Sequence, residues 1–213
     1  MRIFKHIFIL SLILLILSSC RLAQVQKGQV YRSPQPKGND LQRAIDELGI
    51  KTIINLRGEN SGEDWYDDEK RVADENSVEL INISMSASRL PHRKDLIKLL
   101  DAFKTAPRPI LIHCLAGVDR TGEASALYQM IYMNYSKKDA LHMLSPAYGH
   151  FEKFKPAKRY FIKEVWQGEE WARTSYDPCK TKYEYYDQNN SICHPETDKD
   201  SFINLDSKTD EDT

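Results

Sequence analysis

The sequence predicts a single α/β domain with a central, largely parallel sheet that carries helices on both faces. Short apolar runs of strand length alternate along the chain with stripes of apolar residues at helical spacing. The clearest of these units is a buried strand over residues 109–113, a tight loop, and an apolar helix over residues 123–134. The length of 213 residues, with 41% hydrophobic and 29% charged residues, fits one core of ordinary size plus some unstructured chain.

The first half of the domain has the pattern strand, helix, strand. Residues 30–33 favour an edge strand, because prolines follow directly and end it. An apolar stripe at helical spacing predicts a helix over residues 41–48, and Gly49 stands just past its end, where helices commonly stop. Residues 51–56 are mostly apolar and predict a buried strand.

The second half continues the alternation. Residues 61–76 predict a helix whose many acidic residues form a solvated face. A third strand is expected over residues 78–83, and the apolar stripe in residues 96–103 predicts a helix that prolines stop. After the central helix, further helices are expected over residues 136–144 and 156–165.

The loop before the central helix has the sequence His-Cys-Leu-Ala-Gly-Val-Asp-Arg-Thr-Gly, residues 113–122. A loop that enters a helix directs unpaired backbone N–H groups at one spot, and the helix dipole adds positive charge there, so the spot binds anions. Cys114 and Arg120 face this spot from opposite rims. Positive surroundings favour the thiolate, which is the nucleophile, and a guanidinium holds two phosphate oxygens at once. The loop therefore supplies a nucleophile and an oxyanion cradle.

These residues resemble the signature of cysteine-dependent phosphatases, in which His-Cys is followed by five residues and Arg-Thr. Residues 31–33 and 54–57 also resemble the opening of bacterial and fungal dual-specificity-like phosphatases, which extends the resemblance over residues 29–170. The resemblance implies a three-layer cysteine-phosphatase-like fold and a protein-tyrosine or dual-specificity-type activity. It also implies in-line attack by Cys114 on phosphorus and hydrolysis of the phosphocysteine by water, with no metal or cofactor.

The same resemblance assigns roles within the loop. His113 is expected to organise the loop by hydrogen-bonding its carbonyls, and Thr121 to donate its hydroxyl to the thiolate. The phosphate-binding residues are expected to be Leu115, Ala116, Gly117, Val118, Asp119 and Arg120.

A carboxylic acid is expected to protonate the leaving group. Related families carry an Asp for this on a loop upstream of the cysteine, but residues 80–94 hold no carboxylate. Asp119 is the first candidate, because Gly-x-Asp-Arg-Thr resembles myotubularin-type lipid phosphatases and some secreted bacterial phosphatases; its other role would be to orient Arg120. The alternative acids lie in the acidic helix and beside the empty stretch: Asp64, Asp67, Asp68 and Asp95.

Four further residues have ionisable side chains but match no motif. Arg57 at a strand end either helps to bind phosphate or pairs with Glu59, and the structural role is the preferred interpretation. The remaining three are interpreted as structural histidines: His92, His142 and His150.

Residues 1–19 predict a lipoprotein signal peptide, with a basic start, an apolar core shorter than a bilayer span, and a Leu-Ser-Ser-Cys box. Cys20 would then be the lipidated first residue of the mature chain, followed by a polar leader to residue 28 and a phosphatase domain over residues 29–171. A transmembrane anchor is the alternative. The expected location is outside the cytoplasm, on a bacterial membrane. Arg21 favours the outer membrane, facing the periplasm, in a Gram-negative cell.

Residues 172–213 predict a poorly ordered acidic tail with a net charge of -5. In an exported chain, Cys179 and Cys193 are expected to form a disulfide, and two free thiols are the alternative. A metal site that adds His194 is disfavoured, because the spacing matches no familiar ligand pattern.

The charge of the remaining chain bears on the partners. Residues 20–171 carry a net charge of +2, which does not suggest nucleic acid, since nucleic-acid binding uses a basic stripe. A phosphorylated protein is the expected substrate. A phosphoinositide or inositol phosphate is the alternative, motivated by Asp119 and the predicted membrane tether. A phosphate-binding module without catalysis is the alternative from another class; it would be marked by loss of the cysteine or the arginine, and both are present.

Overall fold

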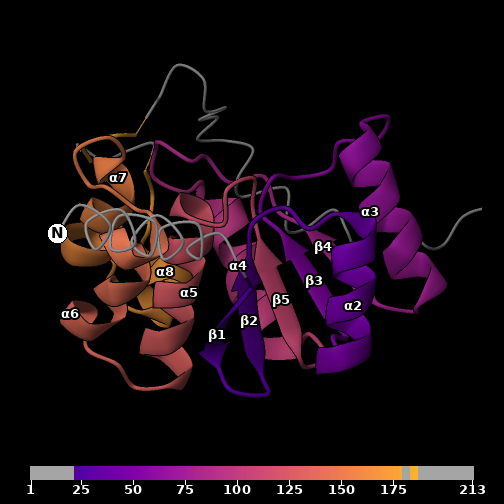
Figure 1. Cartoon of the computed structure of the whole chain (residues 1–213). Helices are drawn as coiled ribbons and strands as arrows, with labels where there is room; N and C mark the ends of the chain where they lie inside the picture. Colours follow the sequence, from indigo (N-terminus) through magenta and orange to yellow (C-terminus); the bar gives the residue numbers. More distant parts are fainter. Residues whose placement is uncertain (1–21, 179–182, 187–213) are drawn as a thin grey trace, which may run out of the picture.

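The computed structural model describes residues 22–178 and 183–186, and its centre is one five-stranded sheet (Figure 1). The strand order is β1-β2-β5-β3-β4. Strands β2, β5, β3 and β4 are parallel, and β1 is antiparallel to β2. The strands span β1 Ala23–Gln26, β2 Val30–Ser33, β3 Thr52–Asn55, β4 Glu79–Asn82 and β5 Ile110–His113.

The register brings three strand ends together at one edge of the sheet. His113 on β5 is aligned with Ser33 on β2 and with Asn55 on β3. In open parallel sheets the ligand site lies outside the carboxyl ends of the strands. The loop that follows His113 therefore starts where the fold favours a site.

Four longer helices and several short ones surround the sheet. The longer ones are α2 Gly38–Leu48, α3 Asp64–Glu75, α4 Arg93–Thr105 and α5 Asp119–Tyr132. The others are α6 Lys137–Ala140, the 3-10 turns η2 Leu141–Leu144 and η3 Pro146–Tyr148, α7 Pro156–Tyr160, the π-helical turn η4 Phe161–Val165 and α8 Glu169–Thr174.

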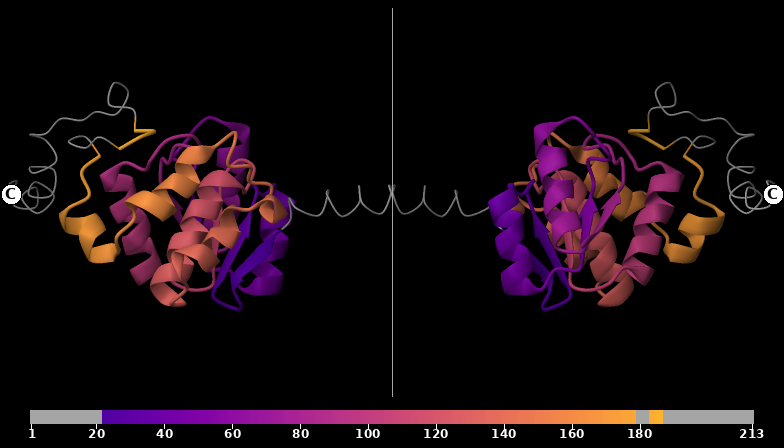
Figure 2. Two further views of the ribbon diagram at one scale, coloured as in Figure 1. Left: turned by 90° about the vertical axis from the view of Figure 1, so that its left-hand side faces the viewer. Right: turned by 90° about the vertical axis from the view of Figure 1, so that its right-hand side faces the viewer.

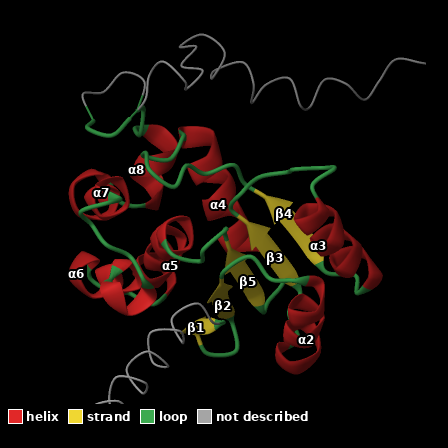
Figure 3. Ribbon diagram, turned by 45° about the horizontal axis from the view of Figure 1, so that its top comes forward, coloured by secondary structure: helices red, strands yellow, loops and turns green. Residues whose placement is uncertain are grey.

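The helices form a layer on each face of the sheet, because successive strand residues point to opposite sides. Tyr31, Ile53 and Leu111 share an apolar cluster with α2 and α3. The alternate residues, including Ile54 and Ile112, belong to the larger cluster with α4 and α5. Figures 2 and 3 show the C-terminal helices gathered on the α4 and α5 side. The predicted three-layer architecture is confirmed.

Helix α5 is the central element of that larger layer. Every residue from Thr121 to Gln129 is buried, so the helix is covered on all sides rather than along one stripe. Its first residue, Asp119, lies four positions before the start predicted from the apolar pattern. The pattern missed this turn because its residues are polar or small and belong to the site.

The folded domain extends beyond both ends of the expected range, residues 29–171. The polar leader over residues 20–28 contains β1, which makes the edge of the sheet and leaves β2 as an internal strand. At the other end, α8 continues to Thr174, and Tyr176 is fully buried and donates its hydroxyl to the Pro91 carbonyl at 2.7 Å. Strand β1 is ordered by backbone pairing with β2, and the segment after α8 is ordered by the buried Tyr176 ring. Neither feature produces a periodic pattern of apolar residues in the sequence.

Several expectations lie outside the described residues: the signal peptide, Cys20, Arg21, and the pairing of Cys179 and Cys193 or their grouping with His194. Within the described ranges, the structure contains no helix with the length and apolarity that a membrane crossing needs.

Candidate active site

The loop between β5 and α5 lies at the carboxyl edge of the sheet, and we call the backbone turn of residues 114–120 the cup. Residues 114–118 connect His113 at the end of β5 to Asp119 at the start of α5, and the Gly122 N–H donates to the Val118 carbonyl at 2.8 Å. The cup is therefore placed at the N-terminus of a long buried helix, where backbone N–H groups and the dipole attract anions.

Cys114 begins the loop and is 3% exposed. Burial by itself raises the pKa of its thiol, but the Thr121 hydroxyl, the Arg120 charge and the backbone N–H groups of Thr121 and Gly117 lower it, and the net pKa is below the ordinary value. The direction of this pKa shift is the one that a thiolate environment requires. A partly desolvated thiolate of this kind is a nucleophile.

Arg120 lies in the first turn of α5 and is anchored from two other segments. Its Nη1 donates to the Leu56 carbonyl at 3.2 Å and to the Met85 carbonyl at 3.4 Å. Its Nε is buried without a partner among the described residues. The side chain is thus held in place while donors remain for a tetrahedral oxyanion.

Arg32 supports the loop from below and is a residue that the sequence pattern indicated only weakly. It is 2% exposed; its Nη2 donates to the Gly117 carbonyl at 2.7 Å, and its Nη1 to the Met143 carbonyl at 3.0 Å. Its guanidinium lies 4.3 Å from the centre of the Tyr148 ring. Burial lowers the pKa of Arg32 to about 10, partly offset by Tyr148 and Cys114, so the group remains a cation at neutral pH. Arg32 hydrogen-bonds the Gly117 carbonyl oxygen on the outer side of the loop. The backbone N–H groups of the loop can therefore point into the cup.

Gly117 makes the closest backbone contact between the loop and the sheet. Its φ is +68°, and a Cβ there would lie 2.5 Å from the Pro34 nitrogen and 2.6 Å from the Ser33 carbonyl oxygen. Next to it, the Gln35 N–H donates to the Leu115 carbonyl at 3.1 Å. The end of β2 therefore braces the loop at a place where only glycine fits.

Asp119 is the first residue of α5, directly after the loop, and its carboxylate has a partner. Its Oδ1 is 2.7 Å from Nδ1 of His150, whose side chain is fully buried, whereas the Asp119 side chain is 20% exposed. The interpretation of His150 as a structural histidine fits its burial, and the structure adds that its partner is Asp119. The contact joins residues 31 positions apart, so sequence spacing carried no signal for it.

The other candidate acids have different environments. Asp67 accepts from the Gly62 N–H at 3.2 Å, Asp68 pairs with Arg71 at 2.6 Å, and Asp64 is exposed in the first turn of α3. Asp95 is buried in the first turn of α4, and this burial raises its pKa. Of the five acids, Asp119 is the one that belongs to the cup; which of them protonates the leaving group stays a prediction.

A chain of polar contacts leads from His113, the residue before Cys114, to Arg57. His113 Nε2 is 2.6 Å from Glu69 Oε1, and both side chains are fully buried. Gln35 Nε2 donates to Glu69 Oε2 at 3.3 Å, and Arg57 Nη1 donates to Gln35 Oε1 at 2.9 Å. Glu69 was expected on a solvated face; it is instead 1% exposed because α3 turns this side chain under the loop. The partner found for His113 is Glu69 rather than loop carbonyls.

Arg57 is a second cation next to the cup. Its guanidinium lies 3.3 Å from the centre of the Trp65 ring. Partial burial lowers the pKa of Arg57, as does the positive charge of Arg120, while Glu69 and Cys114 act in the opposite direction. Arg57 is therefore within electrostatic range of both Cys114 and Arg120, and the partners found for it are Gln35 and Trp65 rather than Glu59.

The remaining loop residues form the open side of the cup. Leu115 is 60% exposed, Ala116 is exposed, and Val118 is half-buried. Small or outward-pointing side chains at these positions leave the backbone accessible to a phosphate. Among residues 22–178 and 183–186, no three Cys, His, Asp or Glu side chains are grouped as metal ligands.

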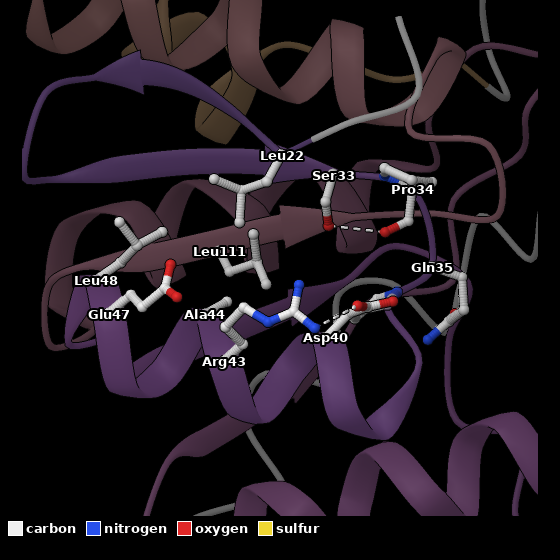
Figure 4. A pocket seen from close by; sticks show the side chains of 11 residues that line it. Leu22, Ser33, Pro34, Gln35, Asp40, Arg43, Ala44, Glu47, Leu48 and Leu111 are labelled. Atoms are coloured by element: carbon white, nitrogen blue, oxygen red, sulfur yellow. Dashed lines mark hydrogen bonds and ion pairs between the residues drawn. The ribbon is translucent and has the colours of Figure 1, made fainter. Parts of the chain in front are cut away.

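A separate pocket of about 630 Å³ lies beyond Gln35, between the end of β2 and α2 (Figure 4). Leu22, Leu48 and Leu111 contribute apolar walls, and Arg43 and Asp40, which are 3.6 Å apart, lie along α2. Its lining contains neither a nucleophile nor a loop residue, so it is distinct from the cup.

Comparisons with known proteins agree with this geometry. The chain is 24% identical over 134 residues to the dual specificity protein phosphatase TpbA of Pseudomonas aeruginosa, which covers 62% of this chain and 57% of TpbA. The chain thus spans little more than half the length of the curated relatives that it matches.

Solved structures show the same fold. The crystal structure of P. aeruginosa TpbA in complex with phosphotyrosine has a TM-score of 0.56 at 20% identity, over 68% of this chain and 85% of that one. The catalytic core of the PP-IP phosphatase SIW14 from Saccharomyces cerevisiae has a TM-score of 0.58 at 24% identity, over 71% and 88%. Residues 20–162 match the model of the family described as DSP-PTPase phosphatase fused to NAD+ kinase. The chain therefore belongs to this dual-specificity-phosphatase-like family, PTP-NADK.

Proposed function

We propose that this protein hydrolyses phosphomonoesters through a phosphocysteine intermediate on Cys114. The observation that carries the proposal is the joint placement of a thiol with a lowered pKa, the anchored Arg120 and the N-terminus of α5 around one cup. A phosphate in this cup would have its oxygens bound by backbone N–H groups and by the guanidinium, with Sγ beneath the phosphorus.

The proposed reaction has two steps. Cys114 Sγ attacks phosphorus, and the bond from phosphorus to the leaving oxygen breaks as that oxygen takes a proton from Asp119. Water then attacks the phosphocysteine, its proton returns to Asp119, and the sulfur–phosphorus bond breaks to release inorganic phosphate and the thiolate. Arg120 stabilises the charge on the phosphoryl oxygens in both steps.

A protein phosphotyrosine or dual-specificity substrate is the main assignment. The curated relative is named a dual specificity protein phosphatase, and its structure was solved with phosphotyrosine. In this chain, Leu115 and Trp65 provide exposed and half-exposed apolar surface beside the cup, which suits an aromatic leaving group.

Arg57 gives specific support to a second candidate, a phosphoinositide or inositol phosphate. A cation next to the cup, preorganised by Gln35 and Trp65, would bind a second phosphate on the same substrate. SIW14, which shares the fold, is a PP-IP phosphatase.

We further propose that the chain is an exported lipoprotein. The basic start, apolar core and Leu-Ser-Ser-Cys box of residues 1–20 support lipidation of Cys20 and a location outside the cytoplasm on a bacterial membrane, which in a Gram-negative cell would be the outer membrane, facing the periplasm. Labelling with a fatty-acid analogue tests this: the full chain should take up the label, and Cys20→Ala should not. Equal labelling of both would contradict it.

The hydrolysis is tested with the full chain on 4-nitrophenyl phosphate. Cys114→Ser should show no turnover and should still bind a phosphotyrosine peptide, because the cup and Arg120 remain. If the wild-type protein binds the peptide and turns over no phosphomonoester, the chain is a phosphate-binding module and the proposal fails.

The two substrate classes are separated by comparing phosphotyrosine and phosphoserine peptides with an inositol phosphate, using Arg57→Gln and, as a matched control, Arg43→Gln on the exposed side of α2. If the substrate carries a second phosphate, Arg57→Gln lowers kcat/KM for the inositol phosphate and leaves the peptides little changed. Turnover of peptides alone excludes the second candidate.

A further inference from the structure

The segment after η3 reaches back to the loop through His150. This residue follows Gly149, and its backbone N–H donates to the Ser145 carbonyl at 3.1 Å, which fixes the start of the segment. Its ring is fully buried, and its Nδ1 is 2.7 Å from Asp119 Oδ1. A completely buried histidine therefore contacts the one acidic residue of the cup.

The protonation of His150 follows from its second nitrogen. Nε2 is buried and has no hydrogen-bond partner among the described residues. A buried N–H without a partner is costly, so the ring favours the neutral tautomer that carries its proton on Nδ1 and leaves Nε2 unprotonated. In this tautomer Nδ1–H donates to Asp119 Oδ1.

The buried charge of Glu123, near Asp119, is compensated by Lys158 rather than by His150. Glu123 and Lys158 form a fully buried pair at 2.8 Å, and Lys158 also donates to the Arg89 carbonyl at 2.7 Å. Burial raises the pKa of Glu123; Lys158 opposes this shift and Asp119 adds to it. Glu123 and Asp119 therefore lie close enough to influence one another, while Lys158 compensates the Glu123 charge.

We propose that His150 is the positioning residue of the general acid: its Nδ1–H fixes Asp119 Oδ1, so that Oδ2 carries the proton and faces the leaving oxygen. This inference rests on the proposed function. It assigns His150 no contact with substrate, because its ring is fully buried. It also explains how an acid in the cup replaces one on a separate upstream loop, since the buried ring holds it rigidly.

The consequence is a specific kinetic pattern. General acid catalysis matters most when the leaving group is a poor one, because a good leaving group departs without a proton. Loss of His150 should therefore mimic loss of the acid. A residue that only supports the fold would lower the rates for all substrates alike.

The test measures kcat/KM of the full chain on phenyl phosphate, which has the poorer leaving group, and on 4-nitrophenyl phosphate. His150→Leu should lose about tenfold or more on phenyl phosphate and much less on 4-nitrophenyl phosphate. His150→Asn, which places an amide N–H where Nδ1 lies, should keep most of the phenyl phosphate activity, whereas His150→Gln, which reaches the Nε2 position, should not. The matched control is His92→Leu, which removes a histidine whose Nδ1 contacts the Tyr186 hydroxyl instead; its ratio between the two substrates should equal that of the wild type.

A double-mutant cycle supplies the decisive comparison. In an Asp119→Asn background, His150→Leu should change the substrate ratio by less than about twofold, because the acid through which it acts is already lost. Equal losses on both substrates, or additive effects in the cycle, would overturn the inference. If His150→Leu does not fold, the comparison of His150→Asn with His150→Gln decides, and equal rates on phenyl phosphate would overturn it. Turnover by Cys114→Ser would instead refute the proposed function, and the two failures are thereby distinct.

Discussion

His113 Nε2 and Glu69 Oε1 lie 2.6 Å apart, and both side chains are fully buried next to the loop that joins β5 to α5. The pair joins the end of β5 to α3, and Gln35 and Arg57 extend it to the rim of the cup. The residue before the nucleophile is thus fixed by a carboxylate from another layer of the fold.

Removing this carboxylate should weaken both the fold and the site. Glu69→Ala leaves the His113 ring buried without its partner, and such a loss costs about 3 kcal/mol of unfolding free energy. The same variant frees Gln35, so kcat/KM should fall as well. Urea unfolding and assays on 4-nitrophenyl phosphate measure the two effects.

Glu75→Ala on the same helix is the matched control. Glu75 pairs with Arg71 at 2.7 Å, but both side chains are more than half exposed, and exposed pairs contribute at most about 1 kcal/mol. If Glu69→Ala and Glu75→Ala lose similar stability, the buried pair is not a support of the loop.

Gly117→Ala should abolish activity. Its φ of +68° is unfavourable for alanine, and the new Cβ would lie 2.5 Å from the backbone nitrogen of Pro34, which is unable to move independently of β2. The loop must shift, and the cup loses its geometry.

Gly49→Ala separates the effect of a positive φ from the effect of a steric clash of the new Cβ. Gly49 has a φ of +65°, but nothing lies within 4 Å of a Cβ there. This variant should lose only about 1–2 kcal/mol of stability from backbone strain and keep full kcat/KM. Full activity of Gly117→Ala would show that the loop tolerates displacement from β2.

Thr121→Val should move the pH dependence of Cys114 upward. Although burial raises the pKa of the thiol, the Thr121 hydroxyl and Arg120 lower it overall, so the thiolate forms at a lower pH than in an ordinary cysteine. Removing the hydroxyl raises the pKa, and the pH at half-maximal alkylation by iodoacetamide should rise. Thr121→Ser keeps the hydroxyl and should resemble the wild type; an unchanged midpoint in Thr121→Val would mean that the hydroxyl does not stabilise the thiolate.

The local sequence was sufficient to predict which residues come together in much of the candidate site. Cys114, Arg120 and Thr121 lie within one loop and one helical turn, so their spacing and the dipole of the following helix constrain them to one cup. Gly49 likewise ends α2 with its backbone in the left-handed region, as its position predicted.

Elements with weak local patterns were missed. Strand β1 has the sequence Ala-Gln-Val-Gln, and only its antiparallel pairing with β2 makes it a strand. The acidic segment was interpreted as solvated because Glu69 is surrounded in sequence by other acids, whereas the helix turns this one side chain inward. The spacing of apolar residues reveals which face of a helix is buried, but it does not reveal a single buried acidic residue such as Glu69.

The sequence by itself determined the α/β layering, the strand-loop-helix unit and the placement of Cys114 and Arg120 within that unit, because these depend on neighbours a few positions apart. Only the tertiary structure decided which distant groups hold that unit: Arg32 under Gly117, Glu69 against His113, and His150 against Asp119. Each is a buried polar side chain whose cost of burial requires a partner, and the partner comes from another element that the packing of the layers brings to the same strand end.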